Sequence, residues 1–159
     1  MRTPRAPWVG LLAATCILTA CAGNGGAGGG GSKPPACVPP RQGASVSFSG
    51  DVQPIFNRSC ALQGCHTAAT QSGNLDLTAG TSYDEVVNVP SSQQPNVKRV
   101  ARGSPDDSYV VRKIIGEPGT ISGAPMPLGC PTPPPGGECL GSDDLSCIEQ
   151  WITECALNN

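Results

Sequence analysis

A shortage of large hydrophobic side chains is the feature that most limits how this chain can fold. Glycine and proline are abundant, with 21 and 17 copies in 159 residues. Neither fills a core well, because glycine has no side chain and proline interrupts regular hydrogen bonding. A bound cofactor or a set of disulfides is therefore expected to complete the core of this small domain. From residue 46 onward the aromatic residues are only five, namely Phe48, Phe56, Tyr83, Tyr109 and Trp151.

The N-terminal residues 1–20 have the pattern of a secretory signal. Arg2 and Arg5 precede an apolar run of 13 residues, which is too short to span a bilayer. The run ends L-T-A-C and resembles the lipobox of bacterial lipoproteins, which implies that Cys21 carries a lipid after cleavage. An ordinary signal peptide with a chance cysteine is the alternative.

Residues 21–45 are expected to form a flexible tether between this lipid and a single domain, residues 46–159. Seven glycines occur in the eleven residues from Ala22, and proline pairs follow. Such a linker reaches roughly 27 Å on average. The implied location is the cell envelope, facing the periplasm, and Ala22 after the lipid site favours the outer membrane by analogy with lipoproteins. Without the signal the chain has eight basic and twelve acidic residues, so a nucleic-acid partner is not expected.

Export permits disulfides, and seven of the nine cysteines remain once Cys16 leaves with the signal and Cys21 takes the lipid. Cys130 and Cys139 flank a loop rich in proline and glycine, and they are the first pair expected to bond. Cys147 and Cys155 lie about 12 Å apart along one expected helix, which is too far for a bridge. The full connectivity stays open for Cys37, Cys130, Cys139, Cys147 and Cys155.

The sequence predicts a mainly α domain with minor strands. The first of four helices is capped by Asp51 and runs toward Cys60; the second is short and follows Ser82. The third has Ser104 as its cap and stops at Gly116. The fourth opens at Ser142 and carries an apolar stripe made of Leu145, Ile148, Trp151, Ile152 and Cys155.

Residues 60–66 read C-A-L-Q-G-C-H, and their histidine is the only one in the chain. Two thiols followed by a histidine are typical of covalent haem attachment, although the usual spacing is C-x-x-C-H. Here two additional residues separate Cys60 from Cys65, and they must loop outward. Two alternatives remain: a Cys60–Cys65 disulfide with an incidental His66, and a zinc site that includes a distant cysteine.

Met126 is the only methionine after the signal, and prolines flank it in A-P-M-P-L-G. A methionine is a common second axial ligand of an electron-transfer haem, and the prolines restrict the loop that would present it. An ordinary loop methionine is the alternative.

The order of these motifs resembles the c-type cytochrome domains of bacterial envelope proteins. The resemblance rests on F-S-G-D-V-Q-P-I-F-N-R-S-C-A-L-Q-G-C-H, then S-G-N-L-D-L, R-G-S-P-D-D-S-Y-V-V-R-K-I, M-P and L-S-C-I-E-Q-W-I-T-E-C-A, and it covers residues 48–156. It implies a small cytochrome c-like helical domain with long Gly/Pro-rich loops around one haem c. Cys60 and Cys65 would bind the haem covalently. His66 would be the proximal ligand of the iron and Met126 the distal one.

The resemblance also implies a one-electron carrier rather than an enzyme, with redox proteins as partners, a lipid as its membrane anchor and no small-molecule substrate. A haem-free, disulfide-stabilised lipoprotein module with a binding or structural role is the alternative function. Packing around the haem is expected from Ile55, Phe56, Leu75, Leu77, Tyr109 and Trp151. A solvated face, or a partner for a haem propionate or an acidic protein, is expected from Lys98, Arg99, Arg102, Arg112 and Lys113.

Overall fold

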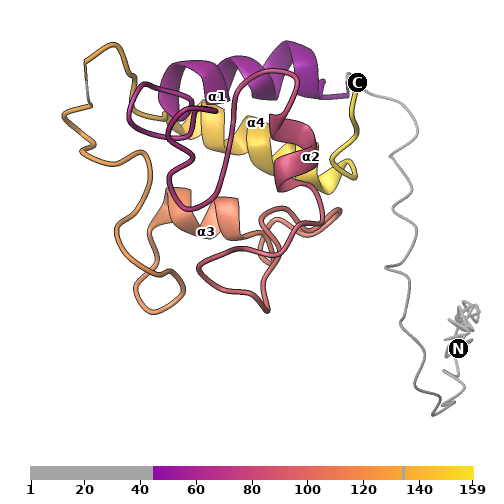
Figure 1. Cartoon of the computed structure of the whole chain (residues 1–159). Coiled ribbons are helices and arrows are strands. Elements are labelled where there is room, and N and C mark those ends of the chain that lie inside the picture. The colour runs from indigo at the N-terminus through magenta and orange to yellow at the C-terminus, as the bar shows by residue number, and fades with distance from the viewer. Residues whose placement is uncertain (1–44, 134) are drawn as a thin grey trace, which may run out of the picture. The chain divides into compact units, whose positions relative to one another are not determined.

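Helices joined by long irregular loops make up the part of the chain that this computed structural model describes, residues 45–133 and 135–159 (Figure 1). No β-strand forms among these residues, and extended segments pair only at isolated bridges. The prediction of a mainly α fold is therefore confirmed. The predicted signal, Cys21, Cys37 and nearly all of the linker lie outside the described residues. The elements in chain order are η1 (Phe48–Val52), α1 (Gln53–Ser59), α2 (Ser82–Val86), α3 (Tyr109–Ile115) and α4 (Ser142–Thr153).

The first helical segment begins earlier than predicted, with the π-helical turn η1 continuing into α1. Its cap is Ser47, whose Oγ accepts a hydrogen bond of 3.1 Å from the N–H of Gly50. Asp51, the expected cap, instead lies in the first turn, where its carboxylate accepts from the N–H of Ser47 at 2.8 Å. A serine oxygen that accepts from a free main-chain amide is a good N-cap. Ser47 can therefore start the helical turn four residues before Asp51.

Asn159 closes the fold by docking on the same turn. Its side-chain Oδ1 accepts from the N–H of Phe48, and its main-chain oxygen accepts from the N–H of Ser49, both at 2.9 Å. These are amides that a helix leaves without an internal partner at its start. The two ends of the domain are thus joined by hydrogen bonds.

The prediction for α2 agrees with the structure, whereas α3 starts later than predicted. α3 begins at Tyr109, because the hydroxyl of Ser104 donates to Asp107 at 2.7 Å and residues 105–107 form a turn. The N–H of Tyr109 then donates to the carbonyl oxygen of Lys98 at 2.9 Å, outside the helix. Gly116 ends α3 with a φ of 74°, as expected of a glycine at this position.

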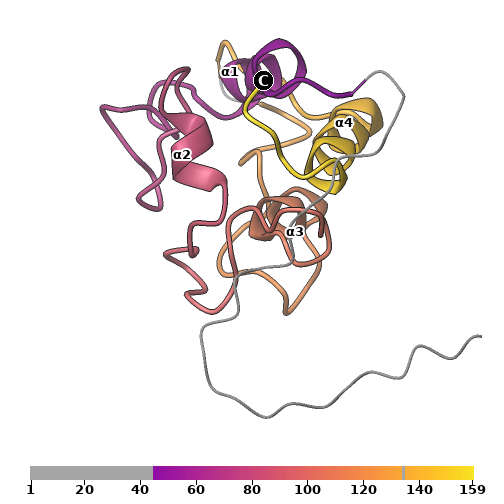
Figure 2. The ribbon, with the colours of Figure 1, turned by 90° about the vertical axis from the view of Figure 1, so that its right-hand side faces the viewer.

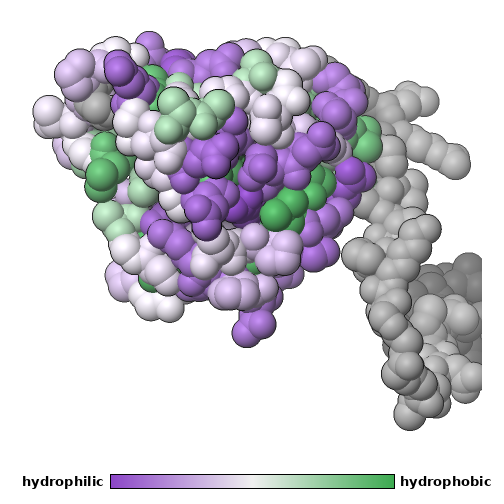
Figure 3. Space-filling view, viewed as in Figure 1, coloured by the Kyte–Doolittle hydropathy of each residue, from purple (hydrophilic) through white to green (hydrophobic). Residues whose placement is uncertain are grey.

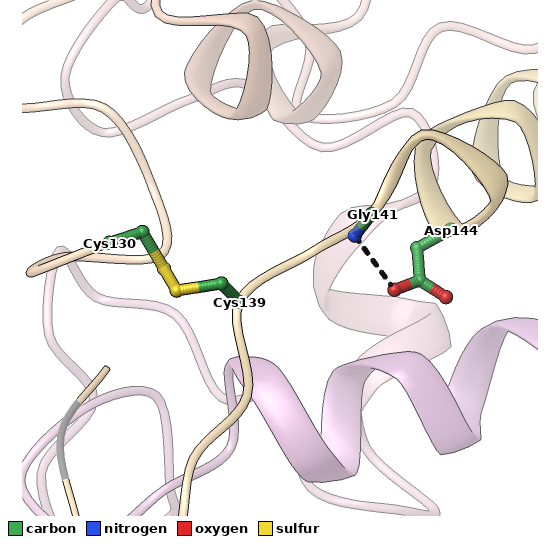
Figure 4. Close-up of a disulfide and its surroundings, with 4 residues drawn as sticks. All are labelled: Cys130, Cys139, Gly141 and Asp144. Carbon is green, nitrogen blue, oxygen red and sulfur yellow. Dashed lines mark hydrogen bonds between the residues drawn. A yellow bond between two sulfur atoms is a disulfide. The ribbon is translucent and has the colours of Figure 1, made fainter. Parts of the chain in front are cut away.

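Helix α4 has Gly141 rather than Ser142 as its N-cap residue. The N–H of Gly141 donates to the carboxylate of Asp144 at 3.2 Å, which Figure 4 shows beside the disulfide. The helix ends at Thr153, so Cys155 lies beyond it, although the predicted apolar stripe included this cysteine. Cys155 is nevertheless buried, with 1% of its surface exposed.

The core lies between η1, α1 and α4, and α3 also contacts α4. In the view of Figure 2, α2 and α4 lie on either side of α1, with α3 below them. Phe48 is central to the packing: its ring centroid lies 5.1 Å from that of Trp151 and 5.2 Å from that of Tyr83. Trp151 is completely buried and donates to the carbonyl of Leu157 at 2.9 Å. Trp151 is therefore part of the protein core.

The surface carries few large hydrophobic side chains. Among the described residues, Ile115 and Leu128 are the exposed ones. The face shown in Figure 3 has small hydrophobic areas dispersed among hydrophilic residues. Within the same part of the chain, no helix is both long enough and apolar enough to cross a membrane.

Candidate haem pocket

An open, mostly apolar pocket of about 270 Å³ collects the predicted site residues. Cys60, Cys65, His66 and Met126 all line it, although Met126 is sixty residues downstream of His66. The apolar part of the wall comes from the end of α1, the loop after the cysteines, α3 and the loop after Met126. Its residues are Phe56, Leu62, Leu75, Leu77, Tyr109, Val110, Ile114, Pro127 and Leu128.

The long spacing between Cys60 and Cys65 is accommodated by a turn. The N–H of Cys65 donates to the carbonyl of Leu62 at 2.9 Å, and Gly64 has a φ of 84°, a value that favours glycine. Gln63 and Gly64 are exposed, whereas Leu62 and Gly64 also line the pocket, so the turn forms part of its rim. The N–H of His66 also donates to the carbonyl of Cys60 at 3.2 Å, which brings the two ends of the motif together.

His66 is partly buried and has an unpaired ring nitrogen. Its Nδ1 is inaccessible to water and has no hydrogen-bond partner among the described residues. Burial lowers the pKa of His66 from its ordinary 6.5, an effect larger than the opposing one of the nearby main-chain groups of Ser72 and Leu75. The imidazole is thus neutral at pH 7, which is the form that binds a metal.

The unpaired Nδ1 is notable because native proteins rarely leave buried polar atoms without partners. One other side-chain atom in the described residues is in the same state, the Oγ of Ser59. Ser59 lines the same pocket. Each such atom costs about 1–3 kcal/mol. Both atoms therefore belong to residues that line the pocket.

The two motif cysteines are free thiols in the structure, and so is Cys147. The pKa of Cys60 rises to about 12, first because of burial and then because of the nearby Cys65. A disulfide between Cys60 and Cys65, one of the alternatives for this motif, is absent from the structure. Among the described residues, no group of three or more His, Cys, Asp or Glu side chains could hold a metal ion. The motif residues Cys60, Cys65 and His66 are therefore not part of such a group.

The structure joins Cys130 to Cys139, the pair expected first, with their Cα atoms 5.7 Å apart (Figure 4). This disulfide closes the loop that follows Met126 and leads into α4. Cys155 is also disulfide-bonded. None of these three disulfide-bonded cysteines is among the residues that line the pocket.

Two of the cations expected on a solvated face are instead buried against the pocket. Arg99 is 7% exposed, pairs with the carboxylate of Glu85 at 2.8 Å and also donates to the carbonyl of Asn74. Lys113 is 8% exposed, and its ammonium donates to the carbonyls of Ser122, at 3.0 Å, and Ala124. Burial lowers the pKa of Lys113. The expectation of a solvated face was wrong for both.

The remaining three cations of that group lie outside the pocket lining. Arg102 stacks over the ring of Tyr83 with 6.0 Å between its guanidinium carbon and the ring centroid. Arg112 and Lys98 each contact a nearby polar group on the loops. Among the residues expected to cover a haem, Phe56, Leu75, Leu77 and Tyr109 line the pocket. Ile55 and Trp151 do not, because both are buried in the helical core.

Sequence reasoning missed the polar part of the pocket wall. Ser91, Ser92 and Gln93 line it from the loop after α2, and no motif in the sequence marks them. Gln93 accepts a hydrogen bond of 2.9 Å from the hydroxyl of Tyr109. Arg99 is buried next to Val100 in V-K-R-V, and no local signal in the sequence marks its position.

In comparisons with known proteins, no protein-family model, no curated protein and no solved structure matches the chain.

Proposed function

We propose that this chain is a c-type cytochrome, with a single haem c held in the pocket formed by Cys60, Cys65, His66 and Met126. More specifically, we infer a one-electron carrier tethered to the cell envelope by a lipid on Cys21. The observation that carries the proposal is the meeting of two free thiols, a neutral imidazole and a thioether on the wall of one mostly apolar pocket.

The residues present fit the requirements of this group. Covalent attachment needs two thiols that are not bonded to each other, and Cys60 and Cys65 satisfy that condition. Axial ligation needs a neutral imidazole at the pocket, and burial lowers the pKa of His66, which favours the neutral form. An apolar wall such as Leu75 and Leu77 excludes water, which is one of the ways in which a protein sets a haem potential.

A bound haem would supply an iron that gains or loses one electron. Met126 is the chain's own candidate for the second axial ligand, because it is the one thioether lining the pocket. If His66 and Met126 both held the iron, oxygen and peroxide would have no free position on it, which favours a carrier over an oxidase or a peroxidase. The polypeptide then has three tasks: to hold the two thiols, to orient the imidazole, and to keep the thioether in place.

The haem-free alternative has less support. It expected Cys60 and Cys65 to be bonded to each other as part of a disulfide framework, whereas both are free thiols. A pocket with two unsatisfied buried polar atoms is also an unfavourable feature for a purely structural module. Redox partner proteins, rather than a small-molecule substrate, are the partners that we propose.

The decisive experiment is the visible spectrum of the full chain made in a bacterial host that attaches haem c. We expect intense haem bands that remain with the protein after acid-acetone extraction. The double variant Cys60→Ala/Cys65→Ala should lose them, while Cys147→Ala, which removes a free thiol outside the pocket, should keep them. A colourless wild-type protein, from a host that matures a reference cytochrome c normally, would refute the proposal.

The tether is tested separately. Cys21→Ser should move the protein from the membrane fraction to the soluble fraction without changing its spectrum. Membrane association that persists in Cys21→Ser would argue against a lipid on this residue.

A further inference from the structure

Lys113 is an unusual lysine, because it is buried on the last turn of α3 and lines the pocket. Lysines are seldom buried without a compensating partner, since removing an ammonium group from water is costly. No carboxylate within 4 Å pairs with its charge among the described residues. The ammonium instead donates to two main-chain carbonyls, those of Ser122 and Ala124.

Both carbonyls belong to the segment that leads directly into Met126. The same lysine holds this segment a third time through its main chain, because its carbonyl accepts a hydrogen bond of 2.7 Å from the N–H of Met126. The three attachment points are therefore residues 122, 124 and 126. Every second residue of the segment is bonded to Lys113, which ties the chain just before Met126 to the end of α3.

Two neighbouring contacts support the same arrangement. The hydroxyl of Tyr109, one helical turn before Lys113, accepts from the N–H of Ser122 at 3.0 Å. Gly116 lets the segment approach closely: a Cβ added there would lie 2.8 Å from the Cβ of Pro125. α3 thus provides a platform on which residues 122–126 rest.

We propose that Lys113 is the positioning residue for Met126, using a buried charge to hold residues 122–126 so that the thioether stays at the pocket. The inference rests on the proposed function for the role of Met126, but the attachment of the segment to Lys113 is independent of haem. A charged donor gives stronger hydrogen bonds to the two carbonyls than a neutral donor would.

The test compares Lys113→Met with Lys98→Met in the full chain. Both variants remove one positive charge, but Lys98 contacts Asn88 and lies outside the pocket. The first readout is amide hydrogen exchange. In Lys113→Met, exchange in the peptide that contains Met126 should become about 10-fold faster or more, while the amides of α4 keep their protection. Lys98→Met should exchange like the wild type in both places.

The second readout uses the haem-bearing protein. Lys113→Met should retain its covalently attached haem but bind carbon monoxide in the reduced state, because the thioether is no longer held in place. Lys98→Met should continue to exclude the gas. A merely structural lysine would alter stability without altering access of the gas.

The outcomes separate the two proposals. Unchanged exchange at Met126 in Lys113→Met overturns the positioning role, whether or not haem is bound. A wild type without haem overturns the proposed function, while faster exchange confined to this segment would still establish the attachment to Lys113. If Lys113→Met does not fold, amide hydrogen exchange of the wild type provides the test. The N–H of Met126 should then exchange as slowly as the amides of α3, and rapid exchange overturns the inference.

Discussion

The main-chain N–H of His66 donates a 3.2 Å hydrogen bond to the carbonyl oxygen of Cys60, six residues earlier. This contact closes the motif across its added length. A second hydrogen bond, from the N–H of Cys65 to the carbonyl of Leu62, closes a turn between the two thiols, and Gly64 adopts the positive φ that this turn requires. A spacing longer than the usual one can therefore still direct both thiols and the imidazole to the same pocket.

Gly64→Ala tests the turn. A Cβ at this position would meet no atom within 4 Å, so the cost comes from the backbone conformation alone, about 1 kcal/mol. Gly80→Ala is the matched control, with a φ of 88° and equally open surroundings. Denaturant unfolding of the haem-free chains should show similar losses for both. Only Gly64→Ala should reduce the haem-to-protein ratio; an unchanged ratio would mean that the turn is not needed for attachment.

His66→Leu should have opposite effects on stability and on cofactor binding. In the haem-free chain it removes a buried nitrogen that has no partner, so the free energy of unfolding should stay unchanged or rise by up to about 1 kcal/mol. In the haem-matured chain it should abolish the native spectrum.

Ser82→Ala provides the contrast for stability, because the hydroxyl of Ser82 is buried and donates to Gln53. Its loss should destabilise the domain by roughly 1–2 kcal/mol in the same unfolding measurement. A native spectrum in His66→Leu would exclude this histidine as an axial ligand.

Met126→Ala should lower the reduction potential of the haem-bearing protein and allow carbon monoxide to bind, since a thioether ligand raises the potential of haem iron. Redox titration and the spectrum under the gas measure the two effects. Ile115→Ala, which truncates an exposed hydrophobic side chain outside the pocket, should change neither substantially. If Met126→Ala retains its potential and still excludes the gas, another group is the second ligand.

Alkylation of Cys60 should depend on pH in an unusual way in the haem-free chain. Its pKa of about 12, against an ordinary 9.0, means that the folded protein carries roughly 10³-fold less thiolate at pH 8. Higher intrinsic nucleophilicity of a high-pKa thiol offsets part of this, so we expect alkylation about 10–100-fold slower than in the denatured chain. The rate should continue to rise as the pH increases above 9.

Peptide mass spectrometry after timed treatment with iodoacetamide measures this rate for Cys60 alone. Equal rates in the folded and denatured chains would contradict the raised pKa of this partly buried thiol. In the haem-bearing protein, a thioether at Cys60 should prevent the reaction at every pH.

Removal of the Cys130–Cys139 disulfide should destabilise the domain. The two cysteines are nine residues apart, and the loss of such a short cross-link is expected to cost about 2–3 kcal/mol in chain entropy of the unfolded state. The double serine variant measures it by denaturant unfolding. Cys147→Ser, which replaces a free and half-buried thiol, serves as the control and should cost less. A double variant as stable as the wild type would show that the loop is held by its other contacts.

Much of the helical framework could be predicted, because the signals that determine it act over a few residues. The end of α3 at Gly116 and the apolar stripe of α4 from Leu145 to Ile152 are of this kind. The start of α3 was not predictable in the same way. The N–H of Tyr109, the first residue of α3, donates to the carbonyl of Lys98, which lies eleven residues earlier in the chain and outside the helix.

The sequence by itself determined the candidate ligands, since Cys60, Cys65 and His66 lie within seven consecutive residues and Met126 is the single methionine of the domain. Only the tertiary structure decided what surrounds them. Trp151 packs on Phe48 in the core, whereas Arg99 and Lys113 leave the solvent and line the pocket. The physical reason is that burial depends on segments far apart in the chain, and a charge can be buried only where distant carbonyls or carboxylates, such as those of Ser122 and Glu85, are brought to meet it.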